Sequence, residues 1–149
     1  MLFMRQTLLI LSLLLPLFTI NSYAQTGNFN LEDWPQTQTS LKPIYVKAIM
    51  EQAGVHSVSF NKSAEFYTAE LDKFANFAQE KNYRPYLKTS VAQNLATIAV
   101  VNCDWNNGVP PWEFAQKYLG EKQLELLQPL YSDAITKLEN NCDQPVNSQ

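Results

Sequence analysis

The side chains that most often carry catalysis are scarce in this chain of 149 residues, which holds one histidine and two cysteines. Histidine is the only residue type that titrates near neutral pH without help, and His56 is followed closely by Ser57 and Ser59. A Ser–His pair would be expected with a nucleophile elbow or a glycine-rich oxyanion loop, and neither pattern accompanies these residues. We therefore interpret His56 as a loop residue bonded to backbone or water.

Two acidic pairs have residue types that could support glycoside chemistry, which uses two carboxyl groups about 5 to 9 Å apart. Glu32 and Asp33 are adjacent in a polar segment, and Glu121 and Glu125 share one face of an expected helix. Neither pair neighbours an apolar cluster that would favour protonation of one carboxyl, so both are interpreted as solvated surface charge. One histidine and two cysteines are too few for a Cys/His zinc cage or a haem-attachment motif. The sequence predicts no catalytic residue, no cofactor and no metal.

Cys103 and Cys142 are the two cysteines, and we predict that they form one disulfide. In an oxidising compartment, two cysteines in a small domain are most simply a structural bridge. Closing a segment of about 40 residues stabilises a fold by about 4 kcal/mol in the chain-entropy model. A redox or nucleophilic thiol is the alternative. Against it, the segment between the cysteines contains no histidine, and the spacing is not that of a C-x-x-C pair.

The segment from Cys103 to Trp112 is the most unusual stretch, with two tryptophans, two asparagines and one acid beside adjacent prolines. A loop stiffened by proline and held by a disulfide loses little entropy on binding, and tryptophan is enriched at binding hot spots. The alternative is that both tryptophans pack on the core while Asp104 or Asn107 bonds to nearby backbone. The binding interpretation assigns the partner-contacting residues as Asp104, Trp105, Asn106, Asn107 and Trp112.

Residues 1–24 have the three-part pattern of a secretory signal peptide. Arg5 precedes an apolar run over 8–20, and small residues follow at the positions that a signal peptidase reads. A transmembrane anchor is the alternative, but the run is about thirteen residues where a span needs about twenty, and Pro16 interrupts it. We expect cleavage after Ala24 and a periplasmic or secreted mature chain.

Charge and composition restrict the class of partner. The formal net charge is −3, and 46% of the residues are hydrophobic and 17% charged. This composition is typical of a globular domain. Nucleic acid and anionic lipid are both disfavoured, because binding to either depends on clustered Lys and Arg. We expect a protein partner, no nucleic acid, and no stable membrane insertion after signal cleavage.

Hydrophobic spacing predicts one helical domain over 40–142. An irregular N-terminal arm at 25–39 precedes it and docks through Leu31 and Trp34, and a frayed tail at 143–149 follows it. The predicted fold class is all-α: a compact bundle of four to six short helices with one disulfide, after a cleaved signal peptide.

The first helix is expected over 41–53, where Gly54 would supply a left-handed stop. The second is expected over 63–81. Each has an apolar stripe at helical spacing. The two stripes are Leu41, Ile44, Tyr45, Ala48 and Ile49, and then Phe66, Tyr67, Leu71, Phe74, Ala75 and Ala78.

Residues 86–102 contain a β-like run, but helical spacing and alanine content favour a buried helix because no convincing partner strand is present. A short helix is expected from Pro111 to near Leu119. A longer helical region follows, in which Pro129 divides or kinks the helix.

From the first cysteine onward, a cysteine precedes a Gly-Val pair, an expected helix ends in Tyr-Leu, and a final helical region leads to the second cysteine. The residues are Cys103, Gly108, Val109, Tyr118, Leu119 and Cys142. This arrangement resembles the helical periplasmic immunity proteins that neutralise type VI secretion amidase effectors. The resemblance implies a non-enzymatic inhibitor that occupies the active-site cleft of a cell-wall-cutting toxin.

These observations predict an exported small helical binding protein, an inhibitor or immunity-type partner of a cell-wall-degrading toxin or another secreted protein. One alternative is a small periplasmic chaperone that binds clients through exposed apolar surface at low pH. Such a chaperone is expected to be richer in charge than 17%. The other alternative is a metal-independent exported enzyme, which would need an acid–base constellation. A secreted hydrolase encoded by the adjacent gene would favour the immunity interpretation.

Overall fold

The computed structural model describes residues 29–55, 60–104 and 109–142. Within these ranges the chain forms one 3₁₀ helix and six α-helices, and the only β-pairing is a single bridge. The predicted all-α fold with one disulfide is confirmed. In chain order the elements are η1 (Leu31–Gln36), α2 (Lys42–Val55), α3 (Ala64–Glu80), α4 (Arg84–Leu87), α5 (Val91–Val101), α6 (Pro111–Tyr118) and α7 (Glu121–Glu139).

Four sequence predictions fall on residues that the structure does not describe. They are the signal peptide at 1–24, the loop role of His56, the partner contacts at Trp105, Asn106 and Asn107, and the frayed tail at 143–149. No helix in the described ranges is both long enough and apolar enough to cross a bilayer.

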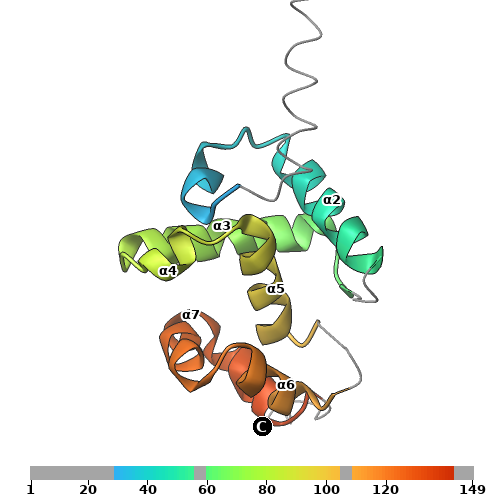
Figure 1. Ribbon diagram of the computed structural model, residues 1–149, viewed down its shortest axis with the longest axis vertical. Helices are drawn as coiled ribbons and strands as arrows, with labels where there is room; N and C mark the ends of the chain where they lie inside the picture. Colours follow the sequence, from blue (N-terminus) through green and yellow to red (C-terminus); the bar gives the residue numbers. More distant parts are fainter. Residues whose placement is uncertain (1–28, 56–59, 105–108, 143–149) are drawn as a thin grey trace, which may run out of the picture.

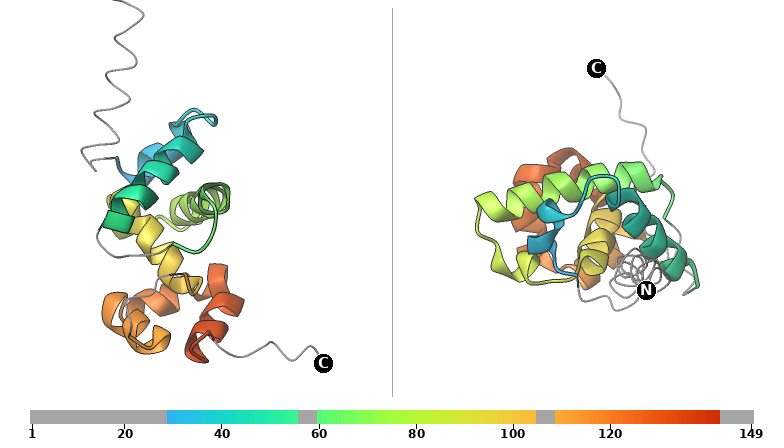
Figure 2. Two further views of the ribbon diagram at one scale, coloured as in Figure 1. Left: turned by 90° about the vertical axis from the view of Figure 1, so that its right-hand side faces the viewer. Right: turned by 90° about the horizontal axis from the view of Figure 1, so that it is seen from above.

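Helix α3 crosses the middle of the molecule, with η1 and α2 on one side, while α5 leads away from it toward α6 and α7 (Figures 1 and 2). Contacts between elements follow this arrangement: α3 packs on α2, η1, α4 and α5, and α7 packs on α5 and α6. Helix α5 therefore joins the two halves of the core. Nine of its eleven residues are buried, and they are Val91, Asn94, Leu95, Ala96, Thr97, Ile98, Ala99, Val100 and Val101.

The helices α3 and α5 begin at capping serines, as their sequences allow. The Ser63 Oγ accepts a hydrogen bond from the Phe66 N–H at 3.2 Å, and the Ser90 Oγ accepts one from the Gln93 N–H at 3.2 Å. A helix that is apolar on nearly all sides is a buried helix, which explains why residues 91–101 form α5. The choice of helix over strand for this region is confirmed.

The apolar stripe predicted for the second helix is confirmed in α3, where five of its six residues are buried. Helix α6 begins at Pro111, as predicted. The kink expected from Pro129 is also present, because Tyr131 in α7 has non-helical angles of φ −126° and ψ 29°. A proline removes one backbone hydrogen bond of the helix and clashes with the preceding turn.

Helix α2 corrects two predictions. Its inward positions include Lys42 and Val46, whereas Ile44 of the predicted stripe is 59% exposed. The helix also continues through Gly54 to Val55, so Gly54 is not a left-handed stop. The orientation of α2 is set by the Lys42 ammonium, which lies 2.6 Å from the Asp72 carboxylate of α3. Periodicity could not reveal this pair, because it counts Lys42 as a surface residue.

The N-terminal segment is also more ordered than predicted, because the arm expected to be irregular contains η1. Docking through Leu31 and Trp34 is confirmed, since both side chains are 0% exposed. The Trp34 Nε1–H donates to Asp72 Oδ1 at 2.8 Å, and the Lys42 ammonium lies 5.1 Å from the centre of the indole ring. The Leu31 N–H donates to the Thr89 carbonyl at 3.0 Å. This segment is therefore part of the core.

Candidate functional site

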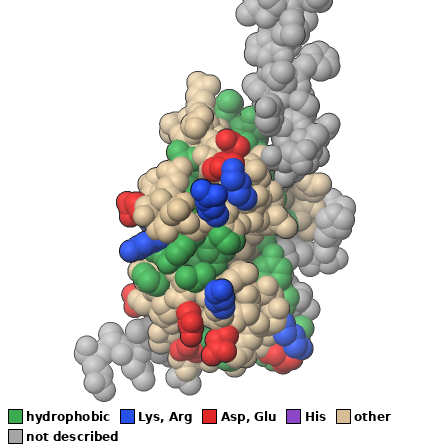
Figure 3. All heavy atoms as spheres, turned by 60° about the vertical axis from the view of Figure 1, so that its left-hand side comes forward, with side chains coloured by type: hydrophobic (Ala, Val, Ile, Leu, Met, Phe, Trp, Pro, Cys, Tyr) green, Lys and Arg blue, Asp and Glu red, His purple; other side chains and the backbone are tan. Residues whose placement is uncertain are grey.

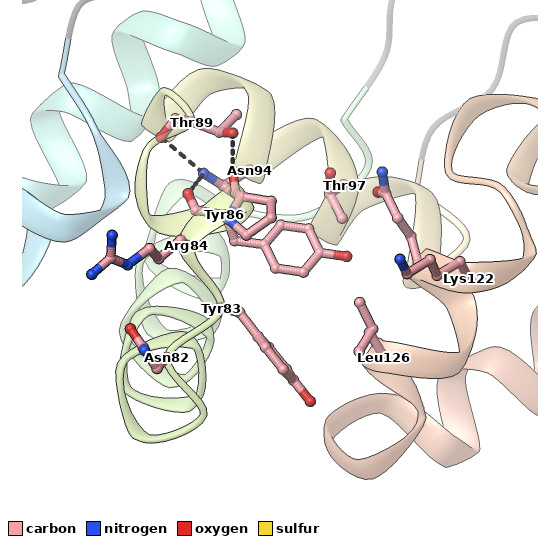
Figure 4. Close-up of a pocket in the computed structure, with 11 residues that line it drawn as sticks. Asn82, Tyr83, Arg84, Tyr86, Thr89, Asn94, Thr97, Lys122 and Leu126 are labelled. Atoms are coloured by element: carbon pink, nitrogen blue, oxygen red, sulfur yellow. Dashed lines mark hydrogen bonds between the residues drawn. The ribbon is translucent and has the colours of Figure 1, made fainter.

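A cleft of about 670 Å³ lies between α4, the first turns of α5 and the first turns of α7 (Figure 4). Sequence analysis did not predict it, because it depends on elements that are distant in the chain. Its walls combine tyrosine rings and one leucine with several amide and hydroxyl groups. The lining residues are Asn82, Tyr83, Arg84, Pro85, Tyr86, Thr89, Asn94, Thr97, Lys122, Gln123 and Leu126.

A tight turn between α3 and α4 positions the two tyrosines of the cleft. Asn82 has a φ of 52°, a left-handed conformation that asparagine tolerates better than most residues. This allows the Tyr83 N–H to bond to the Ala78 carbonyl at 2.8 Å. The Tyr83 and Tyr86 ring centroids are 6.4 Å apart, and Tyr86 packs edge-on against Phe74 at 5.1 Å. The tyrosines are thus tied to the core.

Asn94 contributes a fixed amide to the cleft. Its Nδ2 group donates to the carbonyl oxygens of Tyr86, Thr89 and Ser90 at 3.1, 3.1 and 3.0 Å. Because Nδ2 is surrounded by acceptors, the orientation of the amide is determined. The side-chain oxygen, Oδ1, has no hydrogen-bond partner among the described atoms, although Asn94 is only 1% exposed.

The hydroxyl group of Tyr86 is the second buried polar group of the cleft lining that has no partner in the described structure. Tyr86 is 7% exposed, and its hydroxyl points from α4 toward the space in front of α7 (Figure 4). Burial, and then the neighbouring Tyr83, raises the pKa of Tyr86 to about 12. The hydroxyl therefore stays protonated at neutral pH and can donate a hydrogen bond.

Two cations stand at opposite rims of the cleft, Arg84 on α4 and Lys122 on α7, and no acidic side chain lines it. Neither cation forms an ion pair with any residue that the structure describes. Figure 3 brings this side of the molecule forward and shows a band of hydrophobic side chains with basic side chains above and below it. The cleft therefore combines two cationic side chains at its rims with an apolar wall.

The structure places Asp104, one of the predicted partner-contacting residues, in the interior. It is 3% exposed, and its Oδ1 lies 2.7 Å from the Lys62 ammonium. Burial, and then the Asp104 carboxylate, raises the pKa of the adjacent Tyr67 hydroxyl. Lys62 supplies the opposite charge that allows this acid to be buried. Asp104 therefore holds the start of the loop in place and does not present its carboxylate at the surface.

Trp112 is half-buried in the first turn of α6. Its backbone N–H donates to Asn141 Oδ1 at 3.1 Å, which ties α6 to the end of α7. The indole borders a hollow of about 490 Å³ whose lining also includes Glu121, Glu125 and Glu139. Glu121 and Glu125 are exposed, as expected of solvated surface charge. The other predicted contacts, at Trp105, Asn106 and Asn107, lie outside the described residues.

The predicted disulfide between Cys103 and Cys142 is confirmed, with an S–S distance of 2.06 Å and a Cα–Cα distance of 6.0 Å. Cys103 is the second residue after α5, and Cys142 is the third residue after α7. The bridge therefore joins the ends of these two helices. Asp104 and Asn141 are the neighbours of the two cysteines, so the bridge also fixes the positions from which they make their own bonds.

The tyrosines predict a specific response to alkaline pH. Burial, and then the nearby carboxylate of Glu70, raises the pKa of Tyr131. The pKa values of Tyr67 and Tyr86 are also raised, for the reasons given above. A raised folded-state pKa contributes stability that is present below the unfolded value, about pH 10, and is lost as the pH rises through the folded value. We expect the free energy of unfolding to decrease above about pH 10. We also expect these three tyrosines to form phenolate at a higher pH than free tyrosine does.

Denaturant unfolding at stepped pH and ultraviolet phenolate absorbance would measure both effects. The Tyr86→Phe variant should show a shallower loss of stability, because one shifted group is gone. If every tyrosine ionised near pH 10 while the protein stayed folded, the burial of these hydroxyl groups would be refuted.

The cleft residues that sequence analysis missed did leave one signal. Asn94 lies in the middle of an apolar helical sequence, and a polar residue at such a position is normally hydrogen-bonded or functional. Tyr83, Tyr86 and Lys122 gave no signal, because tyrosine and lysine are ordinary surface and core residues.

Within the part of the chain that the structure describes, no three His, Cys, Asp or Glu side chains gather as a metal site requires. Comparison of the chain with protein-family models, curated proteins and solved structures finds no match.

Proposed function

We propose that this protein is an exported binding protein that inhibits a cell-wall-degrading toxin or another secreted protein, in the manner of an immunity protein. The observation that carries the proposal is the rigid support of Trp112. Trp112 is half-buried at the start of α6, and its backbone N–H is bonded to the Asn141 side chain. The residue after Asn141 is Cys142, which forms the disulfide with Cys103.

This support matters because a pre-organised aromatic side chain loses little entropy when it binds. Tryptophan can bury a large area in a partner, and hot-spot residues are enriched in tryptophan. The segment 105–108 leads from Asp104, whose carboxylate is paired with Lys62, toward Trp112, whose N–H is bonded to Asn141. Trp105, Asn106 and Asn107 belong to the proposed contact surface with Trp112, and Asp104 supports it from within.

The charge around Trp112 suggests the character of the partner. Glu121, Glu125 and Glu139 line the hollow beside the indole. Complementary charge accelerates association and disfavours wrong partners more than it adds affinity. We therefore expect the partner to present a basic surface to this face of α6 and α7.

Export is part of the same proposal. A disulfide that joins two helix ends is typical of proteins that fold in an oxidising compartment. The pattern of residues 1–24, with a short apolar run and a cleavage site after Ala24, supports secretion to the periplasm or beyond.

The test begins by asking whether a gene adjacent to this one encodes a secreted hydrolase, and then uses that hydrolase as the target. The purified mature protein should abolish its cleavage of cell-wall material at equimolar concentration, and Trp112→Ala should restore cleavage at that concentration. Ile44→Ala is the matched control, because it removes an exposed apolar side chain from α2. A hydrolase that is equally active with and without the protein would refute the inhibitory function.

A further inference from the structure

We propose that the cleft between α4 and α7 is a second binding site, independent of the Trp112 surface, for a small organic carboxylate with an apolar body. The volume of about 670 Å³ lies within the range of about 300–1,000 Å³ that is typical of small-molecule sites. The site is formed by Tyr83, Tyr86 and Leu126 as the apolar wall, with Asn94 and Lys122 as polar groups.

The two buried polar atoms without partners are the reason to infer a ligand. A buried donor or acceptor without a hydrogen bond costs about 1–3 kcal/mol, and such groups are few in native proteins. The described residues contain five such atoms, and two of them, Tyr86 Oη and Asn94 Oδ1, belong to residues that line the same cleft. The Nδ2 bonds of Asn94 prevent its amide from turning to satisfy Oδ1. Neither atom is exposed to solvent in the structure, so a bound molecule would supply the missing partners after a small shift of the side chains that cover them.

The charges determine the sign of the ligand. The lining includes Arg84 and Lys122 and no acidic residue. A carboxylate placed near Lys122 would form an ion pair, and the Tyr86 hydroxyl, which stays protonated, could donate to one of its oxygens. Asn94 Oδ1 is a hydrogen-bond acceptor and cannot donate, so the ligand also carries an N–H or O–H group.

The tyrosines and Leu126 determine the shape of the ligand. The Tyr83 and Tyr86 rings face the cleft from α4, and Leu126 and Lys122 face it from α7 (Figure 4). Aromatic rings bind planar or branched apolar groups through offset or edge-on contacts. An N-substituted aromatic amino acid has all three features: a carboxylate, an N–H donor and an apolar body.

The experiment uses N-dansyl-phenylalanine and its neutral amide as fluorescent probes, titrated with the complete mature protein. The two probes share the same body and differ only at the carboxyl end, where the amide has no charge and carries N–H donors in place of one acceptor oxygen. We expect saturable binding of both and about tenfold tighter binding of the carboxylate at low ionic strength, decreasing as salt is added. Failure of either probe to saturate, or equal affinities of the two, would refute the proposal.

Two variants locate the binding. Lys122→Gln should remove most of the preference for the carboxylate and leave the amide unaffected. Lys137→Gln is the matched control, because it removes an exposed charge from the same helix outside the cleft. If both substitutions had the same effect, the preference would come from the overall charge of the protein and the site would be wrong.

Tyr86→Phe separates ligand binding from folding. The substitution should weaken the binding of both probes by about threefold or more, because the hydroxyl donor is lost. The melting temperature should stay the same or rise, because a buried hydroxyl without a partner has been removed. Unchanged affinity for both probes would refute the assignment of Tyr86. None of these outcomes depends on inhibition of a hydrolase, so this site and the proposed function fail or succeed separately.

Discussion

Trp34→Ala is expected to lower the free energy of unfolding by about 3–5 kcal/mol, the usual cost of truncating a buried aromatic side chain. Trp34 lies in η1 and is completely buried, and its indole N–H and ring contact Asp72 and Lys42. The substitution would leave a cavity and remove both contacts. For a domain of this size such a loss is a large part of the total stability. Chemical denaturation of the purified mature protein measures it.

The control uses the same substitution at Trp112, which is half-buried and should cost much less. Trp34→Phe retains most of the apolar volume and loses the hydrogen bond to Asp72, so it should be intermediate. If Trp34→Ala were no less stable than Trp112→Ala, the N-terminal segment would not be part of the core.

Removal of the disulfide is the second large effect. The Cys103→Ser, Cys142→Ser double variant is expected to be less stable by about 2–5 kcal/mol, because the unfolded chain regains the freedom that the bridge removes. Thermal and denaturant unfolding with and without a reductant would show it. The wild-type protein should be destabilised by the reductant and the double variant should not.

The same variants test whether the bridge has a purely structural role. At a temperature where the double variant is folded, it should still inhibit the hydrolase, because the bond from the Trp112 N–H to Asn141 can still support the indole and no cysteine is assigned to the contact surface. Equal stability of the oxidised and reduced wild-type protein would contradict the structural role. Loss of inhibition by a folded double variant would instead indicate that the bridge shapes the binding surface directly.

The fold was predictable where the hydrophobic periodicity agrees with the residues that start, kink or end helices. The α3 stripe, the α6 start at Pro111 and the α7 kink after Pro129 each follow from local rules of helix geometry. The disulfide followed from the number of cysteines. In each case the deciding information lies within one segment of the chain, or in the pairing of the only two residues of one type.

The orientation of α2 and the order of the N-terminal segment were not predictable in this way. Both depend on Asp72, which lies 30 residues after Lys42 and 38 residues after Trp34 in the sequence. Lys42 can turn toward the core because Asp72 forms an ion pair with its ammonium group. A long-range ion pair of this kind leaves no trace in hydrophobic spacing.

The candidate site, too, was predictable only where residue type within one segment was enough to identify a residue. Trp112 was identified from residue type, and the structure shows it half-buried beside an acidic hollow. Asp104 was assigned to the surface from its place in a polar segment, whereas Lys62 pairs with it in the interior. The cleft needs α4, α5 and α7 to meet, which only the tertiary structure reveals.

Binding of a secreted hydrolase encoded by an adjacent gene to the Trp112→Ala variant, measured by titration calorimetry together with the melting temperature of the same preparation, tests the central claim most directly. The account predicts affinity weaker by about 2 kcal/mol or more, about thirtyfold in Kd, with a nearly unchanged melting temperature. Ile44→Ala should match the wild-type protein in both quantities. A Trp112→Ala protein with a much lower melting temperature and full affinity would contradict the claim, because Trp112 would then be a core residue and not a binding residue.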